Sequence, residues 1–277
     1  MLKLQHLTKQ FGAAPLFTDL CMEVDAPVVL WAPSGWGKTT LLRILMGLER
    51  PTTGSVEGVG RVAAVFQEDR LCPQLNAVQN VTLVLPGAEN QYKEQIASDF
   101  QQLGMDTAAL QLPARRLSGG QKRRVAIAGV MAMEPKILVL DEPAAGLDPE
   151  GRDTILSQIR NYHEQTGITV ILVSHSMEDI ARYANRVLVM SKAKVAMYDT
   201  VEKVFARAPE LLELGLSVPQ VTQVFLMLKA MGMEIDTDVY TVPYAVKTVL
   251  KAWNAKHPDK AVPLPQNHKT VQEGGAD

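Results

Sequence analysis

Hydrophobic positions along the chain fall into short apolar runs that alternate with longer helix-favouring stretches. Five runs are rich in β-branched residues and flanked by turn or polar residues, which predicts buried strands. They are Val28 to Trp31, Arg61 to Phe66, Lys136 to Leu140, Ile168 to Val173 and Arg186 to Met190. Helix formers separate the runs, as in Thr39 to Leu45. Because buried strands that alternate with helices are typical of a largely parallel sheet covered on both faces, the pattern predicts an α/β domain.

Two parts of the chain depart from this alternation. Between Pro86 and Arg116 the sequence is polar and favours helix, which predicts a helical insert on the sheet. After about residue 205 the strand pattern stops, and two amphipathic helices are expected. The first would open with a capping box of Ser217 and Gln220, and the second would open at Thr241. The apolar stripe of the first helix is Val221, Val224, Phe225 and Leu228. That of the second helix is Ala245, Val246, Val249, Leu250 and Trp253.

These patterns divide the 277 residues into three parts. Residues 1–205 form the main domain, with its helical subdomain at about 80–130, and residues 206–256 form a small C-terminal helical unit. From His257 the sequence is polar, rich in proline and glycine and without periodicity. A disordered tail is therefore expected over residues 257–277.

Charge and composition narrow the possible functions. The net charge is -2, with 28 Lys and Arg against 30 Asp and Glu, which argues against a chain that mainly binds nucleic acid. No stretch approaches the roughly 20 apolar residues needed to cross a bilayer. The composition still allows a subunit that docks on a membrane protein. Cys21 and Cys72 have neither the number nor the spacing for a disulfide framework or a zinc site. Two buried or indifferent thiols in a reducing compartment are expected.

The segment Ala32 to Thr40, with the sequence APSGWGKTT, lies where a phosphate-binding loop belongs, between a buried strand and a helix. Its backbone N–H groups and the helix N-terminus would bind phosphate oxygens, Lys38 would reach the β- and γ-phosphates, and the Thr39 hydroxyl could ligate Mg²⁺. The candidate nucleotide ligands are Pro33, Ser34, Gly35, Trp36, Gly37, Lys38, Thr39 and Thr40. Ala32 replaces the usual first glycine and is tolerable only if its φ stays negative. The alternative is a chance glycine-rich turn.

Two further segments carry candidate chemistry. The run Lys136 to Leu140 ends in Asp141 and Glu142, at the sheet edge where open α/β folds bind ligands. Asp141 would hold Mg²⁺ and Glu142 would polarise the attacking water, unless the strand simply ends in acids before a proline turn.

The segment Leu117 to Gln121 opens a helix with Ser-Gly-Gly, a second anion site. Ser118 could also be a plain N-cap. Lys122 and Arg123 are expected on a solvated face.

In order and rough spacing, these motifs resemble those of an ABC-type ATPase, the nucleotide-binding subunit of ABC transporters, over residues 1 to about 200. Gly146-Leu147-Asp148-Pro149 and Ser174-His175-Ser176 complete the resemblance. It implies a P-loop NTPase fold with a mainly parallel sheet core, an antiparallel β part and a helical subdomain, and ATP and Mg²⁺ as cofactors. By resemblance, Phe11 would stack on adenine, Gln67 would sense Mg²⁺ and the membrane partner, Asp148 would couple two sites across a dimer, and His175 would contact the γ-phosphate.

The resemblance also implies how the phosphate-binding loop and the Ser-Gly-Gly helix start are used together. Ser118, Gly119, Gly120 and Gln121 of one subunit would close on the γ-phosphate held by Lys38 of another, in a head-to-tail dimer. The implied catalytic residues are Glu142, His175, Lys38 and Gln67, and the implied Mg²⁺ ligands are Thr39, Gln67 and Asp141. The partner could be a second copy of the chain or a related ATPase.

Individual segments indicate which kinds of ABC importer ATPase the chain resembles most. Arg124 to Pro135 and Leu214 to Gln220 resemble the ATPase subunits of energy-coupling factor importers of vitamins or transition-metal ions, in which the C-terminal unit helps to hold the ATPase pair. Val65 to Leu71 is more similar to ATPases of nitrate, taurine or sulfonate importers.

The resemblance therefore implies an ATP-hydrolysing importer subunit at the cytoplasmic face of the cell membrane, with membrane subunits docking near Gln67 to Val81. The alternatives are an ABC-type ATPase that acts on ribosomes or DNA, and a degenerate site that binds nucleotide without hydrolysing it.

Overall fold

A six-stranded sheet forms the centre of the chain. The computed structural model describes residues 2–12, 14–33, 35–58, 60–68, 70–87 and 89–263, and only the backbone of Glu89 and Asn90. The strand order is β5-β6-β7-β3-β8-β9. The strands are β5 (Val62–Val65), β6 (Ile137–Asp141), β7 (Thr169–Val173), β3 (Val28–Trp31), β8 (Arg186–Ser191) and β9 (Lys194–Thr200). All but β9 are parallel to their neighbours, so the five predicted strands and the α/β class are confirmed.

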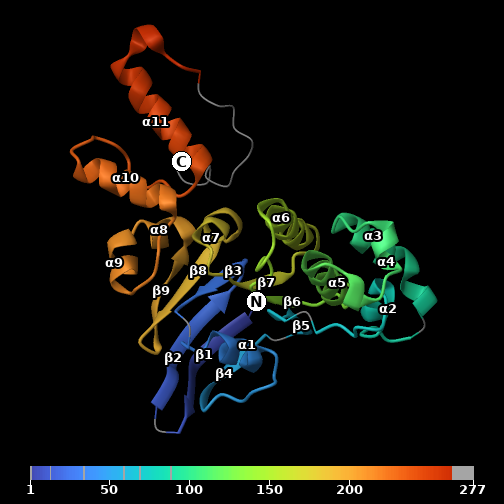
Figure 1. Cartoon of the computed structure of the whole chain (residues 1–277). Coiled ribbons are helices and arrows are strands. Elements are labelled where there is room, and N and C mark those ends of the chain that lie inside the picture. The colour runs from blue at the N-terminus through green and yellow to red at the C-terminus, as the bar shows by residue number, and fades with distance from the viewer. Residues whose placement is uncertain are drawn as a thin grey trace.

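A second, antiparallel sheet packs below the first in Figure 1, with the order β2-β1-β4. Its strands are β1 (Leu2–Phe11), β2 (Ala14–Val24) and β4 (Thr53–Glu57). The apolar residues of β1, such as Leu2, Leu4 and Leu7, join α1 (Lys38–Leu45) and one face of the main sheet in a shared core. The pattern did not locate this sheet because register shifts after Leu4 and Leu7 interrupt the period-two alternation of β1.

Helices cover the other face of the main sheet and extend to one side of it (Figure 1). The extension begins with α2 (Ala77–Thr82) and ends with α5 (Gly119–Met131). Between them lie η1 (Glu89–Tyr92), α3 (Lys93–Gln102), α4 (Thr107–Leu110) and η2 (Ala114–Arg116). These elements confirm the predicted helical insert. α6 (Pro149–Thr166) and α7 (Met177–Tyr183) complete the layer.

The C-terminal part projects away from the sheets in Figure 1. It comprises α8 (Val201–Phe205), α9 (Ala208–Glu213), α10 (Gln220–Ala230), α11 (Val242–Lys256) and η3 (Pro258–Lys260). Ala208, Leu211, Leu216 and Val218 lie in the main core, so a separate helical unit would begin nearer Pro219 than residue 206. α10 and α11 enclose a small core of their own around Phe225, Val239 and Ala245.

One expectation for this part is wrong, the capping box at Ser217. α10 begins at Gln220 with no side-chain capping bond, because the extended backbone of Pro219 (ψ 140°) places the N-cap at Pro219, two residues after Ser217. The Asn254 side chain forms two hydrogen bonds of 2.8 Å with the backbone of Val262, and η3 lies within residues 257–263, while a disordered tail over residues 257–277 stays a prediction. Residues 264–277 of the expected tail lie outside the described residues.

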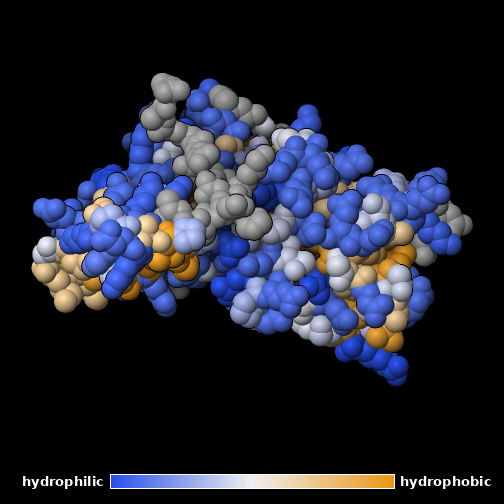
Figure 2. All heavy atoms as spheres, turned by 90° about the horizontal axis from the view of Figure 1, so that it is seen from above, coloured by the Kyte–Doolittle hydropathy of each residue, from blue (hydrophilic) through white to orange (hydrophobic). Residues whose placement is uncertain are grey.

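Hydrophobic surface gathers at the left end of Figure 2, where α10 and α11 lie. Their predicted apolar stripes are therefore only partly buried. The exposed apolar side chains there are Val224, Met227, Met231, Met233, Val242, Val246, Val249 and Trp253. Among the described helices, none combines the length and the apolar character needed to cross a membrane.

Candidate functional site

A cavity of about 600 Å³ opens at the carboxyl ends of the parallel strands. It brings together many of the residues that the sequence predicted to bind or hydrolyse nucleotide. These are Gly35, Gly37, Lys38, Thr39, Thr40, Gln67, Asp141, Glu142 and His175. Leu16, Ala145 and Val173 complete the lining. Residues from four separate loops therefore face one space.

The phosphate-binding loop has the backbone that its sequence requires. Gly35 and Gly37 have φ values of 84° and 83°, and a Cβ at Gly37 would lie 2.7 Å from the Leu16 side chain. Ala32 is buried and is not among the described residues with positive φ, so its methyl group is tolerated. The half-buried Trp36 packs against the core beside the antiparallel sheet. Ser34 lies outside the described residues.

Lys38 is the first residue of α1 and is held by its own loop. Its Nζ donates hydrogen bonds to the carbonyl oxygens of Ala32 and, at 3.2 Å, Pro33. Burial lowers the pKa of Lys38, while the carboxylates of Glu142 and Asp141 oppose that shift. The ammonium group is thus poised at the mouth of the loop, where phosphate oxygens would replace the carbonyl acceptors.

Two carboxyl groups follow β6 and lie in a partly buried environment. Burial raises the pKa of Asp141, and the charges of Lys38, Arg123 and His175 oppose it. Burial, with the adjacent Asp141 carboxylate, raises the pKa of Glu142 to about 7. Glu142 also adopts a left-handed backbone, with φ of 51°. Such a conformation is costly for a non-glycine residue and is found preferentially at functional sites.

The Glu142 side chain faces His175 across the cavity. His175 Nε2 lies 3.6 Å from Glu142 Oε1, beyond hydrogen-bond distance, and Oε1 is buried without a hydrogen-bond partner among the described residues. Burial and the Lys38 charge lower the pKa of His175. The imidazole is therefore neutral near pH 7, so the cation that lowers the pKa of Glu142 is Lys38 and not His175.

Arg123 corrects an expectation from the sequence. It does not lie on a solvated face: it is 4 % exposed and its guanidinium donates to the carbonyl oxygens of Phe66 and Gln67, and at 3.5 Å to that of Glu142. One α5 side chain thus joins the loop after β5 to the loop after β6. Its position four residues before the buried Ile127 could have indicated the buried face of the helix. Lys122 is half-buried.

The remaining predicted residues lie outside this lining. Ser118 is the N-cap of α5 and forms a capping box with Gln121, with hydrogen bonds of 3.2 and 2.9 Å. Ser118 and Gly119 are exposed. Asp148 is the exposed N-cap of α6 and accepts a bond from the Gly151 N–H at 3.0 Å. Phe11, at the end of β1, is 57 % exposed, with the Lys9 ammonium 4.7 Å from its ring.

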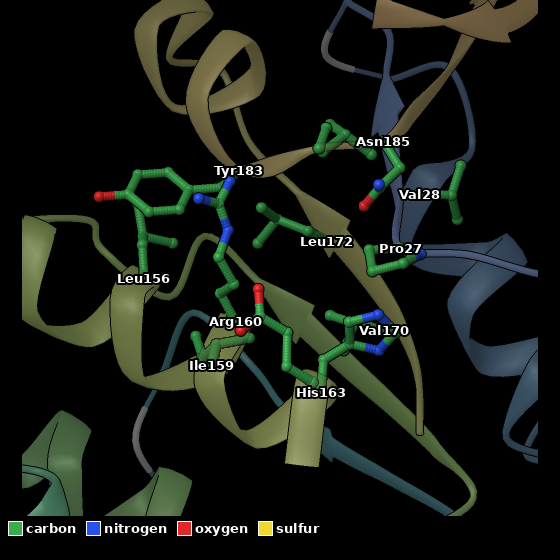
Figure 3. Close-up of a pocket in the computed structure, with 13 residues that line it drawn as sticks. Pro27, Val28, Leu156, Ile159, Arg160, His163, Val170, Leu172, Tyr183 and Asn185 are labelled. Carbon is green, nitrogen blue, oxygen red and sulfur yellow. The ribbon is translucent and has the colours of Figure 1, made fainter. Parts of the chain in front are cut away.

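A smaller cavity of about 240 Å³ lies at the opposite, amino edge of the same sheet (Figure 3). Val28, Leu156 and Leu172 give it apolar walls. Two of its polar side chains are already engaged: the Arg160 guanidinium donates to the Arg182 carbonyl and stacks over the Tyr183 ring, and His163 Nδ1 lies 2.6 Å from the Ile168 carbonyl oxygen. It lacks the convergent charged groups of the carboxyl edge and does not resemble a phosphate site.

Comparisons with known proteins agree with this geometry. Residues 18–145 match the family described as ABC transporter. The ATP-binding cassette MJ0796, solved as a dimer in a post-hydrolysis state with ADP and Pi, superimposes with a TM-score of 0.66 at 26 % identity, covering 73 % of this chain and 99 % of that chain. Among solved structures, cbiO1 from Clostridium perfringens, part of the ABC transporter complex cbiONQ, gives a TM-score of 0.68 at 27 % identity, covering 83 % and 96 %.

Curated relatives are more similar in sequence. The energy-coupling factor transporter ATP-binding protein EcfA2 of Clostridium perfringens is 38 % identical over 244 residues, or 81 % of this chain and 86 % of that protein. The protein of the same name from Symbiobacterium thermophilum is 41 % identical over 240 residues, or 78 % and 82 %.

Fold and site together define an ATPase of the ABC class, in which ATP hydrolysis powers transport. Within that class, the chain belongs to the family of energy-coupling factor transporter ATP-binding proteins.

Proposed function

We propose that this chain hydrolyses ATP in the cavity at the carboxyl edge of the sheet, as one half of a head-to-tail ATPase pair that drives import through membrane subunits. The observation that carries the proposal is the convergence of Lys38, Gln67, Asp141, Glu142 and His175 on one cavity of about 600 Å³. Phosphate-binding, metal-binding and proton-accepting groups are all present in that set.

The loop before α1 binds the triphosphate. Its N–H groups and the helix N-terminus favour phosphate oxygens, and the Lys38 ammonium exchanges its bonds to the Ala32 and Pro33 carbonyls for bonds to phosphate. The exposed Phe11 ring offers a face on which adenine can stack.

The donor set in the cavity fits Mg²⁺. The Thr39 hydroxyl, the Gln67 amide oxygen and the Asp141 carboxylate are hard oxygen ligands, and Mg²⁺ prefers such ligands together with substrate phosphates. Burial disfavours the ionised form of Asp141, so a nearby cation would be stabilising there. When bound, Mg²⁺ supplies neutralisation of phosphate charge.

Glu142 accepts the proton of the attacking water. A carboxylate with a pKa of about 7 is a stronger base than an ordinary glutamate and is still largely ionised slightly above neutrality. The unpartnered Oε1 leaves a lone pair available for that water. The neutral His175 imidazole is placed to donate a hydrogen bond toward the γ-phosphate.

The exposed helix start at Ser118 serves a partner's nucleotide. Ser118 to Gln121 are not among the residues that line the chain's own cavity, and the first N–H groups of any helix lack partners inside the helix. In a head-to-tail pair these groups close on the γ-phosphate bound by the facing Lys38, and Asp148 lies at the junction. The exposed apolar side chains of α10 and α11 give the helical unit after Pro219 a surface for holding such a pair.

A groove of about 220 Å³ between β5, α2 and α5 is the proposed docking site for the membrane subunit. It is lined by Phe66, Leu71, Leu83, Val84 and Val130, among others, and overlaps the predicted segment Gln67 to Val81. Arg123 connects this segment to the backbone of Glu142, so movement in the groove reaches the catalytic loop. Docking there would place the chain at the cytoplasmic face of the membrane.

Glu142→Gln tests the proposal. The amide is nearly isosteric but cannot take a proton, so turnover should fall by roughly 10²- to 10⁴-fold while ATP affinity is retained. ATP should then trap a closed pair, which light scattering after size exclusion measures. Glu178→Gln, which changes an exposed glutamate on α7, is the matched control. Normal turnover by Glu142→Gln, in the chain alone and with its membrane partner, would overturn the role of Glu142.

A further inference from the structure

Outside the nucleotide cavity, three side chains with metal-binding atoms meet on the antiparallel sheet. His6 comes from β1, and Asp19 and Cys21 come from β2; one ligand atom of each lies within 4.8 Å of the others. His6 Nδ1 is 2.7 Å from Asp19 Oδ1 and 3.7 Å from Cys21 Sγ. All three residues are exposed and accessible to an ion from solvent.

Two bulges on facing strands produce this arrangement. Leu4 pairs with Met22 and Leu7 with Leu20, so two residues of β1, one of them His6, oppose Cys21 alone. Lys9 then pairs with Phe17, so two residues of β2, one of them Asp19, oppose a single residue of β1. Bulges redirect side chains that a regular ladder would hold apart.

The backbone at both bulges is left-handed. φ is 49° at His6 and 52° at Asp19, in the region that non-glycine residues rarely occupy. Local hydrogen bonds hold these residues in place: the His6 N–H donates to Cys21 Sγ at 3.2 Å, and the Asp19 N–H donates to Thr8 Oγ1 at 3.0 Å. The three ligand atoms thus converge through the backbone, which lowers the entropy lost when an ion binds them.

One of the three separations is close to that of tetrahedral coordination, and a second needs only a small adjustment. Zinc–nitrogen and zinc–sulfur bonds of about 2.0 and 2.3 Å at a tetrahedral angle place N and S about 3.5 Å apart. The observed 3.7 Å between His6 Nδ1 and Cys21 Sγ is close to that value. The imidazole and carboxylate need to separate by about 0.6 Å, which exposed side chains achieve by small rotations. A fourth position stays open for water.

We propose that His6, Asp19 and Cys21 form a binding site for a divalent d-block cation of the zinc type. Thiolate and imidazole ligands favour Zn²⁺ or Co²⁺ over Mg²⁺, which distinguishes this site from the all-oxygen set in the nucleotide cavity. The thiol must deprotonate, so each cation bound releases the Cys21 proton to solvent. Cys21 is exposed and not buried, and the sequence could not show the cluster because it does not reveal that β1 and β2 pair in this register.

Titration of the reduced full chain with Co²⁺ in Mg²⁺-containing buffer tests the proposal. We expect one equivalent of Co²⁺ to produce a thiolate-to-cobalt charge-transfer band, and Zn²⁺ to abolish it by displacement. Cys21→Ser should eliminate the band. His6→Asn and Asp19→Asn should weaken binding by roughly tenfold or more, and asparagine tolerates the left-handed backbone at both positions. Cys72→Ser, which changes the other free cysteine, is the matched control and should behave like the unaltered chain.

Thiol reactivity gives an independent measurement. Cys21 is exposed, so a thiol reagent should modify it rapidly, and excess Zn²⁺ should slow that modification in the unaltered chain. His6→Asn should remove this protection without changing the rate in the absence of metal. A band that persists in Cys21→Ser, a band lost in Cys72→Ser, or no one-to-one Co²⁺ binding would each overturn the proposal.

Discussion

The N-termini of α1 and α5 both suit phosphate, yet their surroundings differ. The start of α1 opens into a cavity with Lys38, two carboxyl groups and a histidine, all with pKa values shifted by burial. The start of α5 is exposed and its hydroxyl is held in a capping box. The ionisable groups with shifted pKa values therefore lie at the start of α1. The start of α5 offers neutral hydrogen-bond donors. In the proposed head-to-tail pair, each terminus would be half of a site that two chains complete.

Of the changes at these two helix N-termini, an arginine at the start of α5 should have the largest effect. Ser118→Arg fills the exposed helix start and removes a donor aimed at the partner's γ-phosphate. Turnover should fall by roughly 10²- to 10³-fold, as when an oxyanion donor is lost. ATP affinity, measured by calorimetry, should stay unchanged because Lys38 is intact. Ser118→Ala, which removes the cap but leaves the space open, should cost less; a Ser118→Arg variant that loses ATP affinity would contradict the separation of roles.

A change at the start of α1 should instead lower the affinity for ATP. Lys38→Ala removes the charge that reaches the phosphates, and ATP affinity should fall by roughly 10- to 100-fold, the range for a charge-assisted hydrogen bond. Binding of a fluorescent ATP analogue measures this change. Mixing Lys38→Ala with Ser118→Arg chains should restore some hydrolysis, because a mixed pair retains one intact composite site. Without recovery, the second half of the site would belong to a related ATPase.

A smaller effect is expected at the link between the loops. Arg123→Lys keeps the charge, but its single ammonium nitrogen lacks the planar guanidinium whose two terminal nitrogens span the three carbonyl groups, so the loops after β5 and β6 should lose their fixed relation. We expect kcat to fall by about tenfold with KM nearly unchanged, since misplacement affects chemistry more than binding. The neighbouring Lys122→Met serves as the control. An Arg123→Lys variant with normal kcat would remove the link from the mechanism.

The smallest effect concerns pH. Because Glu142 accepts a proton only when ionised and its pKa is raised to about 7, kcat/KM should fall as pH drops through that value. Between pH 7.5 and 6.5 the decrease should be roughly threefold. His175 does not account for it, because its lowered pKa places its titration below this window. A profile that stays flat down to pH 6 would exclude Glu142 as the titrating base.

Much of the fold could be predicted because its signals are local. The five buried strands, the helical insert and the phosphate-binding loop each show within a short window of sequence. The antiparallel sheet was expected from the family resemblance but could not be located, since its bulges break the alternation in β1. The capping box at Ser217 failed because Pro219 places the helix start two residues later.

The candidate site was predictable where motif and loop coincide, and less so where long-range packing decides. Lys38, Asp141 and Glu142 follow strands that meet at one edge, so their convergence follows from a parallel sheet. Arg123 was placed in solvent because a basic triplet favours that interpretation, whereas the partners that hold it are backbone carbonyls 56 and 57 residues away. The His6, Asp19 and Cys21 cluster likewise depends on strand register.

The bonds from Lys38 to its own loop give the site an internal competitor. Phosphate oxygens must displace the Ala32 and Pro33 carbonyls, which lowers the apparent affinity for any nucleotide. The same two hydrogen bonds stabilise the phosphate-binding loop when the cavity is empty, so the loop is already in the conformation that a triphosphate needs. The ammonium can return to the same two carbonyl oxygens whenever the phosphates leave, so Lys38 keeps its position in the empty loop.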